Sequence, residues 1–147
     1  MLWAMRDLFS GMPATPRTRL SLPLYLSPVA AGFPSPAEEE LARRLDLNEF
    51  LIRNPAATFF VRAQGDSMRD AGIATDDLLV VDRAAQPRNG SIVVAALDGE
   101  LTVKRLCRKN GRLFLVPDNP DYAPLEVPPE ASLTVWGVVT YVIHKAG

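Results

Sequence analysis

Cysteine and histidine are almost absent from this chain, in which Cys107 and His144 are the only residues of their types. A single cysteine cannot form an intrachain disulfide, which agrees with a reducing cytoplasm, where we expect the protein to act. One thiol and one imidazole are also too few for the usual metal sites built from these ligands. We therefore predict neither a metal site nor a cofactor.

An excess of charge of one sign is lacking as well, because 16 lysines and arginines are balanced by 17 aspartates and glutamates, for a net charge of −1. A general phosphate-binding surface is not indicated, and we expect no sequence-specific DNA binding. No stretch reaches the roughly 18 apolar residues of a membrane-spanning helix. The apolar run from Leu20 to Leu26 follows basic residues as in a secretory signal, but it is short and contains Pro23, which argues against one.

What remains is the composition of an ordinary globular protein of 147 residues, 48% hydrophobic and 22% charged. This length suits one domain with a sizeable core. Strand patterns occur at 59–64, 78–82, 91–97, 100–106, 112–117 and 133–144. Asp98-Gly99 and Asn110-Gly111 are typical of tight hairpin turns. We predict a mainly β, compact and mostly antiparallel fold.

The segment from Leu20 to Leu26 alternates leucine with other residues, which is the period of a strand. Pro23 lacks a backbone N–H and so restricts this strand to the edge of a sheet. Two interpretations fit the pattern equally well. The segment is either an ordinary first strand or an extended arm that lays its leucines on another surface.

Two short helices are expected next. The motif Ser35-Pro36-Ala37-Glu38 is typical of a helix start, and the helix should end near Arg44 with Leu41 and Leu45 facing inward. A second capping pattern predicts a short helix over residues 47–52. The fold class is thus a small β domain with one or two short helices.

The stretch from Phe59 to Arg69 places a serine directly after a predicted strand. Gly65 permits the turn that ends the strand, and Asp66 and Ser67 follow it. A serine in this position can present its hydroxyl at the end of a sheet. Taken alone the signal is weak, because most such serines only satisfy a backbone group.

Lys104 lies within the predicted strand over residues 100–106, on the same face as Thr102 and Leu106. A lysine in a strand is usually solvated, or it protects a sheet edge from association. Its position alone therefore does not indicate a function.

Several motifs together resemble the LexA/UmuD family of self-cleaving serine–lysine peptidases, and within it the UmuD-type accessory subunits of SOS-induced translesion DNA polymerases. They are GFPSPA at 32–37, DLNEFLI at 46–52, FVRAQGDSM at 60–68 and GELTVKRL at 99–106, in the family's order and spacing. The resemblance covers most of the chain from about Pro23 onward, whereas residues 1–20 diverge. It implies a LexA/UmuD-like catalytic β domain over 32–147, preceded by an N-terminal arm, residues 1–31, that self-cleavage removes.

By this resemblance Ser67 is the nucleophile, Lys104 the general base, and Ala31-Gly32 the bond that is cleaved. The backbone N–H groups of Asp66 and Ser67 are the candidates for stabilising the oxyanion. UmuD is better known with cysteine before the cleaved bond, and Ala-Gly is the LexA version of the same site. A lysine acts as a base only when neutral, and about one free lysine in a few thousand is neutral at pH 7. Burial of the amine would raise that fraction.

The resemblance also implies partners. A RecA filament on single-stranded DNA would promote cleavage, and the truncated homodimer would join a UmuC-type Y-family DNA polymerase subunit in error-prone translesion synthesis. The leucine-rich arm would then dock as an added strand and deliver the bond to the site. The apolar strand over 133–144 is a candidate dimer surface, although a buried core strand fits its pattern better.

Three alternative functions fit parts of the same sequence pattern. A self-cleaving phage or SOS-type repressor would share the catalytic half, but a helix-turn-helix domain does not fit the short, proline-containing segment 1–31. A signal peptidase would share the serine–lysine chemistry but requires a membrane anchor. A non-catalytic dimeric binding module would leave Ser67 and Lys104 with structural roles only.

Overall fold

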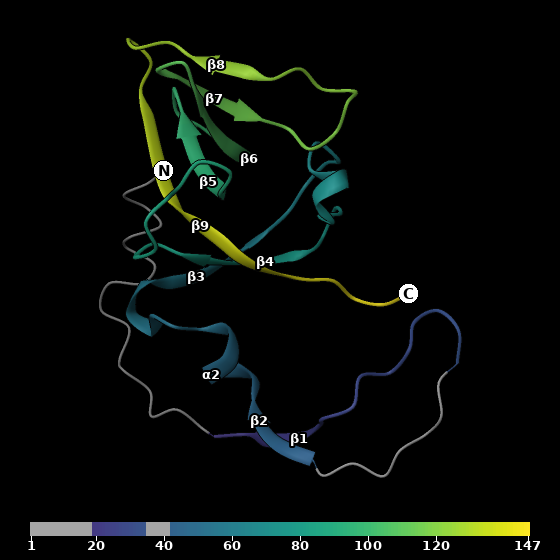
Figure 1. Cartoon of the computed structure of the whole chain (residues 1–147). Coiled ribbons are helices and arrows are strands. Elements are labelled where there is room, and N and C mark those ends of the chain that lie inside the picture. The colour runs from purple at the N-terminus through teal and green to yellow at the C-terminus, as the bar shows by residue number, and fades with distance from the viewer. Residues whose placement is uncertain (1–18, 35–41) are drawn as a thin grey trace. The chain divides into compact units, whose positions relative to one another are not determined.

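The computed structural model describes residues 19–34 and 42–147, which divide into two compact units at the bond between Phe50 and Leu51 (Figure 1). The first unit contains a two-stranded sheet, and the second contains a seven-stranded sheet. The mainly β fold class predicted from the sequence is confirmed.

The first unit is built on one pair of strands. β1 (Ser21–Tyr25) pairs antiparallel with β2 (Ala42–Asp46). The strand predicted for the leucine-rich segment is thus confirmed. Both strands of a two-stranded sheet are edges, so the missing N–H of Pro23 removes no bond from a central ladder. The alternating leucines remain largely exposed, with Leu22 at 56% and Leu24 at 46%.

The helix that was predicted to end near Arg44 is wrong for its last residues, which belong to β2. Residues 35–41, including Leu41, lie outside the described residues, but Ala42–Asp46 is a strand. Its sequence favours a helix, yet pairing with β1 overrides that propensity because β1 needs a partner for its backbone groups. The Arg44 guanidinium adds donor bonds to the hydroxyl and carbonyl oxygens of Ser21.

The second predicted helix is confirmed as α2 (Leu47–Leu51). It begins directly after β2, and the Asp46 carboxylate accepts a hydrogen bond from the Asn48 N–H at 3.0 Å. This is the N-cap interaction that the capping pattern predicted.

The second unit holds a single antiparallel sheet. Its strands are β3 (Thr58–Arg62), β4 (Leu78–Asp82), β5 (Ile92–Leu97), β6 (Glu100–Lys109), β7 (Arg112–Val116), β8 (Leu125–Val127) and β9 (Leu133–Ile143), with 3-10 turns η1 (Pro55–Ala57) and η2 (Arg69–Ala71). Their order in the sheet is β3-β4-β9-β5-β6-β7-β8. The six strands predicted in this region are confirmed, and β8 is an additional strand that the sequence did not suggest.

Two tight turns fix the register of the central hairpins. Asp98 and Gly99 have φ values of 49° and 85°, and Asn110 and Gly111 have values of 53° and 74°. Positive φ at both central residues is the type I′ geometry that matches the twist of paired strands. The two hairpin signals are therefore confirmed, and they place β6 between β5 and β7.

The core lies along the middle strands of this sheet. The best-buried side chains are Leu79, Val80 and Val81 of β4, Val93 of β5 and Leu115 of β7. β9 runs between β4 and β5, and its Trp136 packs edge-on against Phe59 with ring centroids 6.3 Å apart. The centre of the sheet buries only Trp136 and Gly137 of β9, and the other positions of the strand are partly buried or exposed, so its role as a dimer surface stays a prediction.

β9 and β4 approach each other unusually closely at Gly137. A Cβ at this position would lie 2.7 Å from Val81 Cγ1 and 2.9 Å from the backbone oxygen of Asp82. The pairing register between the two strands shifts between Val80 and Val81 nearby, which marks a local irregularity in the ladder. Only glycine fits at this position without displacing backbone.

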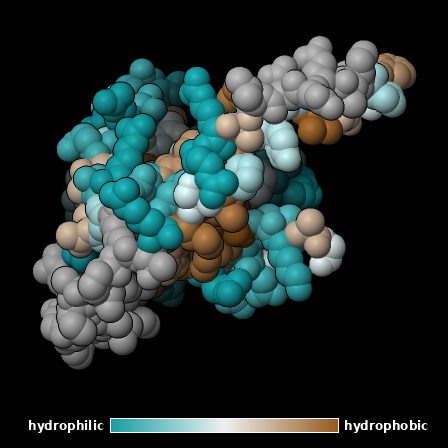
Figure 2. Space-filling view, turned by 90° about the horizontal axis from the view of Figure 1, so that it is seen from below, coloured by the Kyte–Doolittle hydropathy of each residue, from teal (hydrophilic) through white to brown (hydrophobic). Residues whose placement is uncertain are grey.

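Hydrophobic side chains also reach the surface, as the view from below shows (Figure 2). In the seven-stranded sheet they include Phe60 and Tyr141, which lie opposite the same residue, Val80, in neighbouring strands. No helix within residues 19–34 and 42–147 is long and apolar enough to span a membrane.

Candidate active site

Ser67 is held by a turn that follows β3. Gly65 adopts a φ of 88° there, a conformation that glycine takes without strain. The Thr75 hydroxyl accepts from the Gly65 N–H at 3.0 Å and donates to the Gly65 carbonyl at 3.2 Å. The next residue, Met68, is buried, so Ser67 stands between a fixed turn and an anchored side chain.

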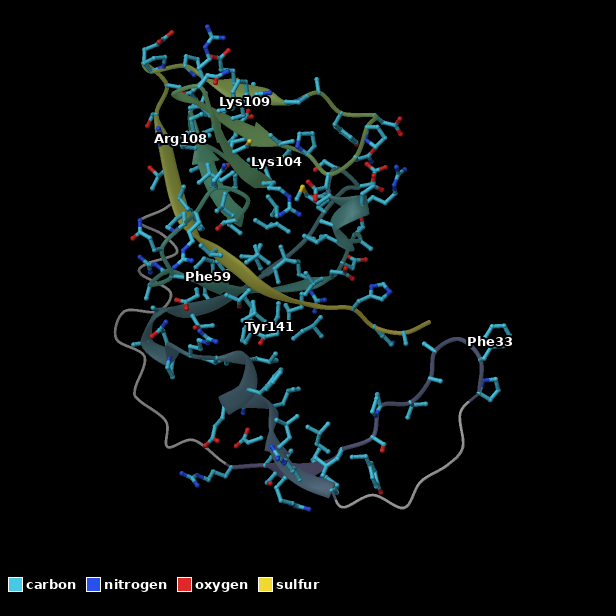
Figure 3. All side chains as sticks on the ribbon, viewed as in Figure 1. Phe33, Phe59, Lys104, Arg108, Lys109 and Tyr141 are labelled. Carbon is cyan, nitrogen blue, oxygen red and sulfur yellow. The ribbon has the colours of Figure 1, made fainter. Side chains whose placement is uncertain are left out.

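Lys104 is held by β6, where it lies opposite Val93 of the neighbouring strand (Figure 3). Its Nζ lies 3.0 Å from Ser67 Oγ, 2.7 Å from Thr102 Oγ1 and 3.1 Å from the Val103 carbonyl oxygen. The structure thus brings together the two side chains that the sequence singled out.

The surroundings of Lys104 favour the neutral amine. Burial lowers the pKa of Lys104 below its ordinary value, because removing water penalises the charged form. Within the described part of the chain, Nζ contacts only uncharged partners and no carboxylate lies within ion-pair distance. Nothing there restores the charged form that burial disfavours.

Thr102 and Val103 occupy two of the three hydrogen-bonding positions of the Lys104 amine, and the third faces Ser67. A neutral amine has two N–H groups and one lone pair, which matches the three contacts of Nζ. The two N–H groups can donate to Thr102 Oγ1 and to the Val103 carbonyl, while the lone pair accepts from the Ser67 hydroxyl. This arrangement is what a general base for a serine requires.

The backbone N–H groups of Asp66 and Ser67 are not used elsewhere. Among the residues that the structure describes, neither group donates to a protein acceptor. They are therefore available to a negatively charged oxygen that forms next to Ser67 Oγ. Their role as oxyanion donors stays a prediction.

A small apolar hollow of about 250 Å³ opens beside Lys104. Its wall consists mainly of aliphatic side chains from β5, β6, β7, β8 and the loop before β8: Leu97, Glu100, Leu101, Thr102, Lys104, Leu115, Ala123 and Leu125. This wall explains the partial desolvation of the amine. It also leaves an apolar space next to Lys104.

The loop between β7 and β8 holds the serine turn, and the sequence alone did not indicate this contact. Asn119 and Tyr122 both donate hydrogen bonds to Asp66, the residue before Ser67. The Asn119-Pro120 dipeptide indicates a turn, but it does not indicate which part of the chain that turn contacts.

Ala31 and Gly32 belong to the first unit. Both are exposed, within residues 26–34, which follow β1 and have no regular secondary structure. No described atom lies within 4 Å of the space that a Cβ of Gly32 would occupy. The peptide bond between them is therefore accessible along an irregular stretch of backbone.

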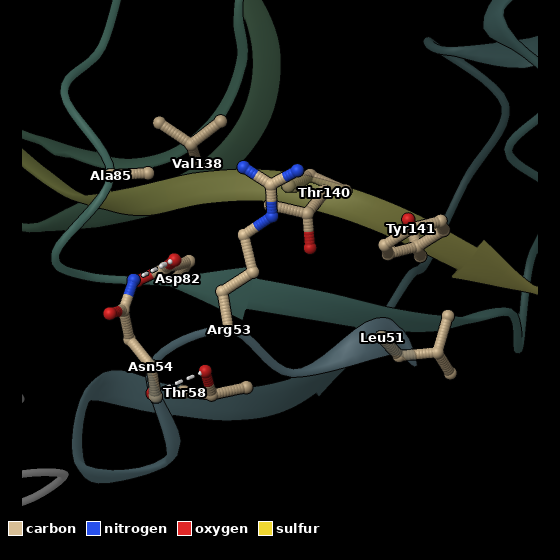
Figure 4. A pocket seen from close by; sticks show the side chains of 10 residues that line it. Leu51, Arg53, Asn54, Thr58, Asp82, Ala85, Val138, Thr140 and Tyr141 are labelled. Carbon is tan, nitrogen blue, oxygen red and sulfur yellow. Dashed lines mark hydrogen bonds between the residues drawn. The ribbon is translucent and has the colours of Figure 1, made fainter. Parts of the chain in front are cut away.

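A second hollow, of about 500 Å³, lies between the segment after α2 and β9 (Figure 4). Three of its polar residues, Asn54, Thr58 and Asp82, are hydrogen-bonded to one another. The Asp82 carboxylate accepts from Asn54 Nδ2 and from the Ala84 N–H, both at 2.8 Å, and the Thr58 hydroxyl donates to the Asn54 carbonyl at 2.7 Å. These bonds tie the entry of the second unit to the sheet and leave no activated nucleophile there.

Residues 23–140 match the family described as Peptidase S24-like. The chain belongs to this family. It is 54% identical over 123 residues to Protein SamA of Salmonella typhimurium, which covers 84% of this chain and 85% of SamA. It is 51% identical over 124 residues to Protein ImpA of Escherichia coli, covering 84% of this chain and 83% of ImpA.

A repressor is also among the relatives. The chain is 42% identical over 138 residues to the LexA repressor of Bordetella pertussis, covering 89% of this chain but 63% of the repressor. Together these matches confirm the resemblance to the LexA/UmuD group that the sequence motifs indicated. SamA and ImpA match over most of both chains, whereas the repressor extends well beyond the matched region.

Proposed function

We propose that this chain is a UmuD-like, self-cleaving serine peptidase that cuts its own Ala31-Gly32 bond. Ser67 is the nucleophile and Lys104 the general base, and cleavage removes residues 1–31 from the β domain over 32–147. The observation that carries the proposal is the 3.0 Å contact between Ser67 Oγ and a partly buried Lys104 Nζ.

The first chemical step forms an ester. Ser67 Oγ attacks the carbonyl carbon of Ala31 while neutral Lys104 takes the hydroxyl proton. The carbonyl oxygen becomes an oxyanion, which the N–H groups of Asp66 and Ser67 stabilise. The intermediate collapses, the carbon–nitrogen bond to Gly32 breaks, and the leaving amine takes the proton from Lys104.

The second step releases the arm. Water attacks the ester between Ser67 and Ala31, and Lys104 accepts a proton from the water. The ester bond breaks, Ser67 regains its proton, and Ala31 leaves with a free carboxylate. Small residues on both sides of the cleaved bond suit this route, because a backbone that must enter a narrow site is least hindered by alanine and glycine.

The biological role follows from the family resemblance and from relatives that match over most of their length. A RecA filament on single-stranded DNA promotes the cleavage. The truncated homodimer then joins a UmuC-type Y-family polymerase subunit in the cytoplasm and acts in SOS error-prone translesion synthesis. The match to SamA, ImpA and MucA over more than four fifths of each chain favours this role over that of a repressor.

The amine environment argues against a non-catalytic binding module. A structural lysine normally keeps its charge in water or beside a carboxylate. Lys104 instead contacts three uncharged polar groups beside an apolar hollow. This placement destabilises the charged form and has a physical reason only if the neutral amine is used.

The test is incubation of the purified protein alone at alkaline pH, followed by intact-mass analysis and N-terminal sequencing. We expect a stable fragment that begins Gly32-Phe33-Pro34 and the matching arm. Ser67→Ala should give no fragment, and Gly32→Glu should block cleavage while circular dichroism stays unchanged. A different start, or a Ser67→Ala protein that cuts at the same rate, would contradict the proposal.

A further inference from the structure

The loop between β7 and β8 holds the residue before Ser67 at two points. Asn119 Nδ2 donates to the backbone oxygen of Asp66 at 2.8 Å, and the Tyr122 hydroxyl donates to the Asp66 carboxylate at 2.6 Å. Asn119 is only 3% exposed, and its own oxygen accepts from the Asp121 N–H at 3.0 Å. A buried amide with both ends bonded is fixed in orientation.

The same loop holds the far side of the serine turn. The backbone N–H of Asp118 points at Met68 Sδ at 3.3 Å, and the Asp118 carbonyl accepts from the Asp70 N–H at 2.8 Å. Residues on both sides of Ser67 are therefore attached to residues 118–122, which we call the bracket loop.

The bracket loop is also attached to the strand that carries Lys104. The Arg105 guanidinium donates to the Asp118 carboxylate from Nη2 at 2.6 Å and from Nε at 3.1 Å. Arg105 is the neighbour of Lys104 in β6, and the bidentate pair is partly buried. One loop thus connects both halves of the serine–lysine pair.

The sheet by itself fixes the distance between Ser67 and Lys104 only indirectly. Ser67 and Lys104 are 37 residues apart, and β4, β9 and β5 lie between their parent strands β3 and β6. Small errors at each strand pair would add up along that path. A misplacement of about 1 Å between reacting groups can lower a rate by about 100-fold.

We propose that Asn119 is a positioning residue for self-cleavage, which acts through Asp66 to hold Ser67 Oγ at its distance from Lys104 Nζ. The inference rests on the proposed function, because it assigns Asn119 to that reaction. The Tyr122 hydroxyl holds the carboxylate of the same residue, Asp66, and the Arg105–Asp118 ion pair anchors the bracket loop to β6.

The experiment compares Asn119→Asp with the wild type. Aspartate has the same shape and keeps the acceptor for the Asp121 N–H, but its second oxygen meets the Asp66 carbonyl without a proton to donate. We expect the first-order self-cleavage rate to fall at least about tenfold, measured where circular dichroism shows full folding. Asn89→Asp is the matched control, because Asn89 also accepts a backbone N–H, from Arg108, and should keep the wild-type rate.

A second measurement separates positioning of Ser67 from effects on the arm. Labelling of Ser67 by a small fluorophosphonate does not require the arm, so a displaced serine should also lower the labelling rate of Asn119→Asp about tenfold. A fall in cleavage with unchanged labelling would overturn the inference, since Asn119 would then act on arm binding. Wild-type rates in both measurements would overturn it as well.

Tyr122→Phe covers the case in which Asn119→Asp does not fold. It removes one hydroxyl at a partly exposed position, and we expect both rates to fall about threefold with unchanged thermal stability. Unchanged rates in this variant would overturn the inference. Failure of the proposed function is distinguishable, because the wild type itself would then neither cleave nor label at Ser67.

Discussion

Lys104 makes an unusual set of contacts for a strand lysine. Its three partners are two hydroxyls and a carbonyl, and none of them carries a charge. Each of these groups can be satisfied by a neutral amine, so the local hydrogen bonding does not require the proton that burial already disfavours. Under the proposed function, Lys104 is therefore ready to act as the base before the Ala31-Gly32 bond enters the site.

The pH dependence of self-cleavage tests directly whether neutral Lys104 is the base. Only the neutral amine accepts a proton, so the rate should rise about tenfold per pH unit and level off above the folded pKa of Lys104. Because burial lowers the pKa of Lys104, the plateau should begin below the ordinary value of 10.5. The measurement is the single-turnover rate without RecA between about pH 6 and 11.

Three variants control the profile. Lys104→Arg should be inactive at every pH, because a guanidinium keeps its proton. Lys104→Ala should lose the pH-dependent step. Lys109→Ala changes an exposed lysine at the end of the same strand and should retain the wild-type profile (Figure 3). A flat wild-type profile, or an active Lys104→Arg protein, would remove lysine from the mechanism.

At the scale of residues, Ser67 and Lys104 could be predicted from the sequence, whereas Asn119 could not. Ser67 and Lys104 were found because each stands inside a motif with a family meaning, although neither was informative alone. Asn119 was not found, because its importance comes from a bond to Asp66 across 53 positions of the chain. A pattern of neighbouring residues cannot indicate a contact between residues that are so far apart in the chain.

At the scale of elements, Gly137 of β9 lies where a Cβ would collide with β4. The atoms that oppose a Cβ there include a backbone oxygen, which cannot move without disturbing the β3–β4 pairing. We expect Gly137→Ala to lower the free energy of unfolding by about 1–3 kcal/mol, measured by urea denaturation.

Thr134→Ala is the matched control for Gly137→Ala. Thr134 lies on the same strand with an exposed side chain, so its replacement should change stability by no more than about 0.5 kcal/mol. If Gly137→Ala were as stable as Thr134→Ala, the close approach of the two strands would not exist in solution.

The elements could be predicted where a local signal and the tertiary environment agree. Both type I′ hairpins satisfied this condition, since Asp-Gly and Asn-Gly specify the turn by themselves. β2 did not, because Ala42–Asp46 has helical propensity and becomes a strand only through its partner β1. β8 was missed because three residues between prolines are too short to show a period.

At the scale of the whole molecule, the question is how the bond between Ala31 and Gly32 reaches Ser67. The bond and the serine–lysine pair belong to different units, and either the same chain or a partner could supply the site. A mixing experiment decides between them. Ser67→Ala protein with an intact arm can be cut only by the site of another chain.

We expect this substrate to be cleaved when it forms mixed dimers with active protein, with accumulation of tagged Ser67→Ala product followed by mass. The expectation rests on the exposed leucines of the described part of the arm, among them Leu22 and Leu24 of β1. Ser67→Ala protein that also carries Gly32→Glu controls for contaminating proteases. A substrate that stays whole in verified mixed dimers, while active chains process themselves, would restrict cleavage to the same chain.

The central place of β9 has a consequence for the newborn protein. The turn with Ser67 follows β3, Lys104 lies in β6, and the strand that joins their two halves of the sheet is the last of the described strands to leave the ribosome. Until residues 133–143 emerge, the β3–β4 pair and the β5–β8 hairpins have no shared ladder. Under the proposed function, residues 133–143 must therefore be synthesised before Ser67 and Lys104 can cut the Ala31-Gly32 bond, and this order of synthesis protects the bond from early cleavage.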